Sequence, residues 1–111
     1  MIDEIMAAAG IPCRRGRFTG KAPATYAVIL DDIDTSSGPD PIAGRQSPQV
    51  LRHDVTLELY EDKPDDAAEA ALEAAIALAG LDYTKQDRYW IQTEQFYQVI
   101  YEFTFFEKRR V

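Results

Sequence analysis

Two stretches of the chain in which apolar and polar residues alternate constrain its fold more than any other feature. An alanine-rich segment separates them. In Val50–Tyr60 the odd-numbered residues are mostly apolar, while the even-numbered ones include Arg52, Asp54 and Glu58. Gln95–Lys108 alternates in the same way over a greater length and is rich in aromatic residues. A period of two is typical of a β-strand with one buried face. Both stretches are therefore predicted as strands, and the second is too long and aromatic to lie at an open edge.

The alanine-rich segment between them has the pattern of a helix that packs closely on a sheet. Pro64–Ala79 has an apolar stripe at helical spacing and acidic residues near its start, and Gly80 follows directly. These features predict a helix over Pro64–Ala79, with Pro64 in its first turn. Apolar residues at helical spacing predict a shorter helix over Ile2–Ala9, which ends at Gly10.

The remaining segments complete an α+β pattern. Strands are predicted over Thr25–Asp34 and Tyr83–Ile91. The second of these is joined to the last strand near residues 92–94. A weaker pattern allows a short strand at Arg15–Phe18. The order α-β-β-α-β-β predicts an antiparallel or mixed sheet of about four strands with two helices packed on it. The 111 residues form a single domain, 1–111. Thr35–Pro48 is predicted to be a long, mobile loop.

Composition limits the classes of function. The net charge is −7, which argues against a general nucleic-acid binder. Cys13 is the single cysteine, so the chain forms no internal disulfide, and a reducing compartment such as the cytoplasm is expected. No apolar run is long enough to cross a bilayer and the first residues lack a basic signal-peptide region, so no membrane partner is expected.

The charges are segregated along the chain. Basic residues gather near the start and at the end, and acidic ones lie between them. The basic groups are Arg14, Arg15, Arg17 and Lys21, then Lys108, Arg109 and Arg110; the acidic groups are Asp31, Asp32 and Asp34, then Glu58, Glu61, Asp62, Asp65 and Asp66. Two interpretations remain open: the basic end of one copy meets the acidic middle of another, or both are solvated surfaces.

The residues that could support catalysis do not form a recognisable set. His53 is the only histidine and is expected to be a packed, hydrogen-bonded residue. Asp31, Asp54 and Glu58 could meet on neighbouring strands as a metal site, although acids on the solvent face of a sheet are the favoured interpretation. Cys13 lies beside basic residues that could lower its pKa, but no base accompanies it. We therefore predict a non-enzymatic protein with no catalytic residues, no cofactor and no metal site.

Aromatic residues crowd the C-terminal hairpin and occupy both of its faces. Tyr89 lies beside Trp90, and Phe105 beside Phe106, so neighbouring aromatic side chains must point to opposite sides. One face is expected to be covered by the helix and the other by a partner, because interfaces are enriched in Trp, Tyr and Arg. The predicted interface residues are Arg14, Arg15, Arg17, Trp90, Phe106 and Arg109.

In sequence, the chain resembles the tail terminator (tail completion, or head–tail joining neck) proteins of long-tailed bacteriophages. The segments that carry the resemblance are GIPCRRGRF, PATYAVILDD, VTLELYEDKPD and LEAAIALAGLDYTKQDRYWIQTEQFYQVIYEFTFFEK. Their order and spacing match a G-I-P turn, a P-x-x-Y strand, an E-L-Y-x-D-K-x-D junction and a terminal hairpin. Only Thr35–Pro48 falls outside the match, and Trp90 departs from the family pattern.

The resemblance implies a structural virion protein of a phage or prophage. It would be made in the bacterial cytoplasm and would form a ring, commonly a hexamer, at the neck of the virion. The ring would cap the head-proximal end of the tail tube, stop its polymerisation and meet a head completion or connector protein. Double-stranded DNA would pass through an acidic lumen without specific binding, because phosphates are repelled there. Thr35–Pro48 would be the part that changes on docking.

Two other hypotheses remain open from the residues alone. The first is a small metal-dependent nuclease that uses Asp31, Asp54 and Glu58. The second is a generic adaptor whose C-terminal hairpin binds one protein partner.

Overall fold

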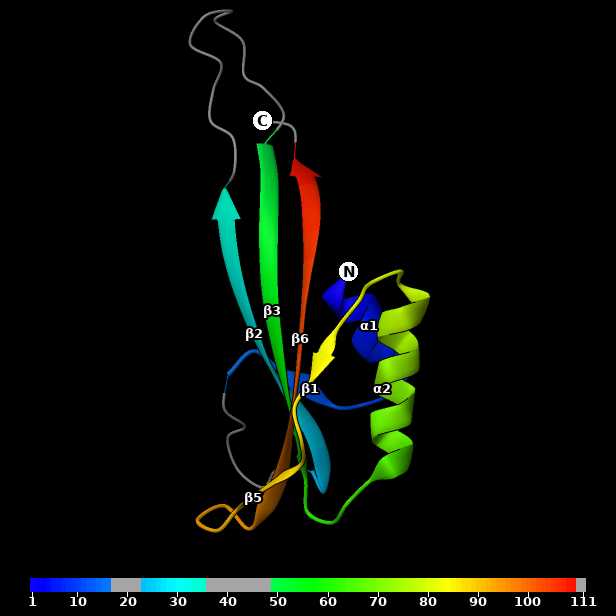
Figure 1. Cartoon of the computed structure of the whole chain (residues 1–111), viewed down its shortest axis with the longest axis vertical. Helices are drawn as coiled ribbons and strands as arrows, with labels where there is room; N and C mark the ends of the chain where they lie inside the picture. Colours follow the sequence, from blue (N-terminus) through cyan, green and yellow to red (C-terminus); the bar gives the residue numbers. More distant parts are fainter. Residues whose placement is uncertain (17–22, 36–48, 110–111) are drawn as a thin grey trace, which may run out of the picture.

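The computed structural model describes residues 1–16, 23–35 and 49–109 as a mixed α+β fold with two helices and a six-stranded sheet (Figure 1). In chain order the elements are α1 (Ile2–Ala9), β1 (Cys13–Arg14), β2 (Thr25–Thr35), β3 (Gln49–Glu61), α2 (Asp66–Leu78), β4 (Thr84–Lys85), β5 (Tyr89–Ile91) and β6 (Phe96–Arg109). The predicted α+β class is confirmed. The sheet has six strands instead of about four, because β1 is added and the strand predicted over Tyr83–Ile91 is divided into β4 and β5. The predicted strand at Arg15–Phe18 is replaced by β1, while Arg17 and Phe18 lie outside the described residues.

The strands follow the order β1-β2-β3-β6-β4. β5 pairs with the same edge of β6 as β4 does, nearer to the start of β6. β1 pairs with β2 in parallel, and every other pairing is antiparallel. β3 is the central strand, and it pairs along its whole length with β6. The long, aromatic last strand therefore lies inside the sheet, as predicted, over the part of its length that β4 and β5 cover.

The two helices lie on the same side of the sheet (Figure 1). In α1 the buried residues Ile2, Ile5 and Met6 share one face, and the left-handed conformation of Gly10 (φ 69°) ends the helix as predicted. In α2 the predicted apolar stripe is confirmed, because Leu72, Ala75 and Ile76 are buried against the sheet. Both helices thus cover one face only.

The start of α2 differs from the prediction. Asp65 is the N-cap, and its Oδ1 accepts a hydrogen bond from the Ala68 N–H at 3.0 Å. Asp65 Oδ2 also accepts from the Thr25 hydroxyl at 2.9 Å, which ties the cap to β2. Pro64 therefore precedes the helix instead of lying in its first turn, because an aspartate satisfies free backbone N–H groups that proline cannot.

The segment predicted as one strand over Tyr83–Ile91 is broken into β4 and β5. Lys85 pairs with Tyr101 and Tyr89 pairs with Gln98, so four steps along this segment match three steps along β6. One residue is therefore extra, as in a β-bulge, and the pairing is interrupted between the two short strands. The irregular residues include Arg88, whose side chain binds several carboxylates of the fold.

The core lies between the helices and the odd-numbered residues of the long strands. It includes Ala27, Ile29, Leu57, Leu59, Val99 and Tyr101, all less than 5% exposed. β3 and β6 have 13 and 14 residues, so each spans roughly 45 Å, whereas α2 with 13 residues spans about 20 Å. The sheet must therefore extend past the helix layer. We call the extension the arm: residues 31–35 of β2, 51–55 of β3 and 103–107 of β6 (Figure 1).

Candidate assembly surfaces

The face of the sheet opposite the helices, here the open face, carries the even-numbered residues of β2, β3 and β6. Leu30 and Phe106 on this face are 50% and 64% exposed, although both are large and apolar. The other members whose side chains are described are half-buried or exposed polar residues, apart from Val28, Val50, Phe96 and Ile100. No described helix covers this face, so it is a surface available to a partner (Figure 1).

The open face is acidic. Register places five carboxylates on it, against two basic residues. The acids are Asp32, Asp34, Asp54, Glu58 and Glu102, and the bases are Arg52 and Lys108. Asp54 accepts hydrogen bonds from the Thr104 hydroxyl at 2.8 Å and from Arg52 Nε at 3.2 Å, which hold the pKa of Asp54 below its ordinary value. An excess of negative charge remains.

Aromatic residues pack together at the base of the open face. The Tyr26 ring stacks on Tyr60 with centroids 5.1 Å apart, and meets Phe96 edge-on at 5.6 Å. On the opposite side of the same hairpin, Trp90 packs on Tyr97 at 4.7 Å and is 37% exposed. Aromatic side chains thus lie on both faces of the C-terminal hairpin, as the sequence predicts.

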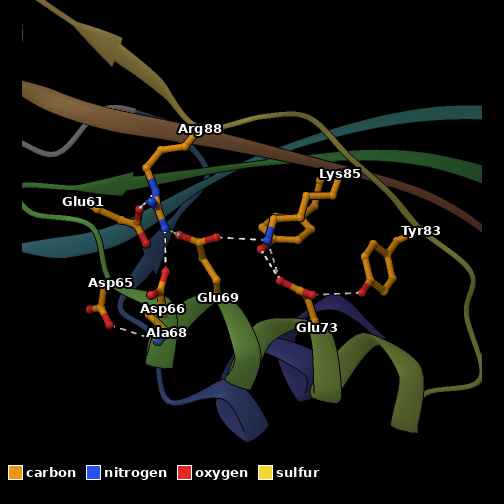
Figure 2. A network of polar contacts seen from close by, with 10 residues as sticks. Glu61, Asp65, Asp66, Ala68, Glu69, Glu73, Tyr83, Lys85 and Arg88 are labelled. Atoms are coloured by element: carbon orange, nitrogen blue, oxygen red, sulfur yellow. Dashed lines mark hydrogen bonds and ion pairs between the residues drawn. The ribbon is translucent and has the colours of Figure 1, made fainter.

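A network of charged residues fixes α2 to the sheet (Figure 2). Arg88 Nη2 donates to Asp66 Oδ1 at 2.7 Å and to Glu69 Oε2 at 2.6 Å, and both acceptors belong to α2. Arg88 Nε lies 3.4 Å from Glu61 Oε1 at the end of β3, and Glu61 is fully buried. This arginine therefore connects the irregular β4–β5 segment with both the helix and the central strand.

A lysine extends the network toward the other end of α2 (Figure 2). Lys85 Nζ lies 3.0 Å from Glu69 Oε1 and donates to Glu73 Oε2 at 2.9 Å. Glu73 also accepts hydrogen bonds from the hydroxyls of Tyr101 at 2.9 Å and Tyr83 at 3.1 Å. Burial and the bond to Glu73 raise the pKa of Tyr101, so the phenol stays protonated as a donor.

The pKa values of the two glutamates beside Arg88, Glu61 and Glu69, are shifted in opposite directions. Burial, together with the nearby Glu69 carboxylate, raises the pKa of Glu61 from 4.5 to about 7. Burial also acts on Glu69, but hydrogen bonds from Arg88 and Lys85 outweigh it and lower the pKa of Glu69. Neither oxygen of Glu61 makes a hydrogen bond of good geometry among the described residues. Glu61 is thus the poorly compensated member of the network, and its proton state follows pH near neutrality.

His53 is packed and hydrogen-bonded, as predicted. It is 6% exposed, and its ring stacks on Phe105 with centroids 4.3 Å apart. Nδ1 lies 3.0 Å from Asp31 Oδ2, and Nε2 lies 3.3 Å from Glu107 Oε2 without hydrogen-bond geometry. Arg15 Nη1 lies 3.6 Å from the same Asp31 oxygen, so the pair links β3, β2 and the residues after β1.

The three carboxylates of the nuclease hypothesis do not come together. Asp31 faces the helix side, where it binds His53. Asp54 and Glu58 lie on the open face, where Thr56 separates them along β3. No cluster of metal-ligating side chains occurs among the described residues. The carboxylates are therefore divided between the two faces of the sheet.

Cys13 lies half-buried on β1. Burial and then the Asp3 carboxylate raise the pKa of its thiol, and Arg15 offsets them only in part. The idea that neighbouring arginines activate this thiol is therefore wrong, because the thiolate is less favoured here than in water.

The predicted interface residues are spread over the fold. Arg14 ends β1 and Arg15 follows it, and both are exposed. Trp90 lies on β5 and Phe106 on the arm. Arg109 ends β6, while Arg17 lies outside the described residues, as do residues 36–48 of the predicted loop. Sequence reasoning missed Leu30 and Ile33, which are 50% and 53% exposed. Their apolar side chains suited a buried strand, and no signal in the strand itself showed that its edge and outer face are open.

Comparison with known proteins gives a likeness of fold. No protein-family model matches the chain, and no curated protein matches it either. Among solved structures, it is similar to a chain of the "Virion of native gene transfer agent (GTA) particle", with a TM-score of 0.57 and 15% sequence identity. The similarity covers 94% of this chain and 84% of the other. At this identity the match shows a shared fold. No helix among the described residues is long and apolar enough to span a membrane.

Proposed function

We propose that this chain is a structural virion protein of a phage or phage-like particle, and that it caps the head-proximal end of the tail tube as a ring. The observation that carries the proposal is that a likeness of sequence and a likeness of fold both point to a component of a virion. The sequence resembles tail terminators over nearly its whole length, and the fold is similar to a chain of a gene transfer agent virion over 94% of its residues.

The surfaces of the molecule support an assembly role. The open face has no described cover, exposes Leu30 and Phe106, and continues along the arm beyond the helices. A ring of copies needs two different contact surfaces on each one, and the chain offers distinct surfaces at the two edges of its sheet. One end of such a ring would meet the tail-tube protein and the other a head completion or connector protein.

The chemistry of the chain supports a role without catalysis. His53 is enclosed by Asp31 and Phe105, and the perturbed carboxylates Glu61 and Glu69 are engaged by Arg88. We propose that the acidic open face lines the lumen, where it repels the phosphates of passing DNA and prevents tight binding.

The proposal is tested by adding the purified protein to the tail-tube protein of the same particle as it polymerises. Tube lengths are then measured by negative-stain electron microscopy. We expect shortened tubes, each with a cap of extra density at one end. An unrelated acidic protein of similar net charge is the control. Tubes of normal length without caps would refute the proposed function.

A further inference from the structure

The sheet has two long strand edges that lack a neighbouring strand in the described part of the chain. β1 pairs with β2 only as far as Val28, and β4 pairs with β6 only at Tyr101 and Glu102. Beyond these points β2 continues to Thr35 and β6 continues to Arg109. Both arm edges therefore present backbone groups suited to a further strand.

The hydrogen bonds that β1 and β4 do make show which backbone groups point outward. Ala27 N donates to Pro12 O at 2.9 Å on the β1 side, and backbone direction alternates along a strand, so the N–H of Ile33 points away from β3. On β6, Ile100 O accepts from Gln86 N at 2.9 Å, so the N–H of Phe106 points outward by the same argument.

The two edge segments lie opposite the same part of β3 and run in the same direction. Residues 31–35 of β2 and 103–107 of β6 pair with the same residues of β3, 51–55. Both strands are antiparallel to β3 and are therefore parallel to each other. If β6 of one copy lies beside β2 of the next, the sheet continues from copy to copy as a parallel pairing.

Each edge borders a hollow and carries charged and apolar side chains that a second copy could contact. Where β4 stops, a hollow of about 480 Å³ lies beside residues 102–104 of β6; where β1 stops, one of about 410 Å³ lies beside residues 29–32 of β2. The β2 edge carries the exposed acids Asp32 and Asp34. The β6 edge carries the acids Glu102 and Glu107 and the exposed Lys108, and Lys108 is the group that would pair with the acids of β2. Ile33 and Phe106 are 53% and 64% exposed at these edges, and a neighbouring strand would cover both.

We propose that the β2 edge of one copy pairs in parallel with the β6 edge of a second copy, so that the arms join into one sheet. The interface is head-to-tail because its halves come from different strands, and such contacts close into rings when the rotation permits. This inference rests on the proposed function only for the ring; the pairing itself rests on the two edges. If the pairing forms, it favours the first explanation of the charge segregation, in which the basic end of one copy meets acids of another.

The test uses one proline on each edge. Ile33→Pro and Phe106→Pro each remove an N–H that points outward, so the pairing with β3 is kept while one edge is blocked. We expect the wild-type protein to assemble with rising concentration in sedimentation velocity, and each variant alone to remain monomeric. An equimolar mixture should form dimers and nothing larger, because the Ile33→Pro copy retains a working β6 edge and the Phe106→Pro copy a working β2 edge.

Matched controls are Ile33→Val and Phe106→Tyr, which keep the N–H groups and should assemble like the wild type. Circular dichroism checks that every variant is folded; if a proline variant is not, Ile33→Lys or Phe106→Lys replaces it. The inference is overturned by a wild-type protein that stays monomeric, by a folded edge variant that still assembles, or by a mixture that forms no dimers. Assembly through these edges without any effect on tube length would instead refute only the proposed function. Capping by edge variants that remain monomeric in solution would show that the cap does not depend on this pairing, and would leave the proposed function standing.

Discussion

Neutralising Glu61 is expected to stabilise the protein at alkaline pH. Glu61 is fully buried at the end of β3, and its pKa is raised from 4.5 to about 7, chiefly by burial. The unfolded chain loses this proton near pH 4.5, whereas the folded chain keeps it until about pH 7. The folded state therefore binds more protons in this window, and stability falls as pH rises through it.

The size of the effect follows from the shift. A difference of roughly 2.5 pKa units corresponds to about 3 kcal/mol at pH values above 7. Glu61→Gln has nearly the same shape and no charge, so it lacks this penalty. We expect its free energy of unfolding at pH 8.5 to exceed that of the wild type by up to about 3 kcal/mol. For a domain of this size, that corresponds to a rise in Tm on the order of 10 °C.

Thermal unfolding followed by circular dichroism at pH 4.5 and pH 8.5 measures this difference. The gain of Glu61→Gln over the wild type should fall below about 0.5 kcal/mol at pH 4.5, where Glu61 is protonated in the folded state and about half-protonated in the unfolded state. Glu102→Gln, an exposed residue of β6, is the control and should show no comparable dependence. The lowered pKa of Glu69 places the loss of its own stabilisation on the acid side of this pH window. A variant with the same gain or loss at both pH values would refute the reasoning.

Three further predictions concern the cap, the core and the thiol. Asp65→Ala should lower the free energy of unfolding by about 1 kcal/mol or more in urea titration, because it removes the N-cap of α2 and the bond to Thr25, whereas Asp62→Ala should have little effect. Leu72→Ala should cost about 2–5 kcal/mol in the same assay, since Leu72 is fully buried, and a cost below 1 kcal/mol would contradict its place in the core. Cys13 should react with iodoacetamide more slowly at pH 8 than a free cysteine does, because the pKa of its thiol is raised; a faster reaction would argue against the geometry of β1.

The alternation of β3 and β6 predicted their positions well, because a half-buried strand shows its two faces in its own residues. The break between β4 and β5 could not be predicted in this way. It depends on how the segment is matched to β6, where Lys85 and Tyr89 pair with Tyr101 and Gln98. Register is a property of two strands, and one strand's sequence does not contain it.

The candidate surface residues fall into the same two groups: some are predictable from the sequence of one strand, and others depend on how the elements pack. The exposure of Phe106 and Trp90 was predicted because neighbouring aromatic residues must occupy opposite faces. The role of Arg88 was not, since an arginine in an apparent strand has the pattern of ordinary surface charge. Its partners Glu61 and Glu69 come from β3 and α2, and only the packing of α2 brings them within reach. The exposure of Ile33 likewise depends on where β1 stops.

The three strands of the arm also relate the number of copies to the width of the opening they enclose. If arms join edge to edge, each copy adds three strands to a closed barrel, so six copies would give roughly 18 strands and three copies about 9. Side chains fill a barrel of about 8 strands, whereas one of 16–18 leaves a water-filled channel. A channel through such a ring would thus require the larger assembly. The total number of arm strands in the closed barrel, and not the size of each domain, would determine whether the barrel contains an open channel.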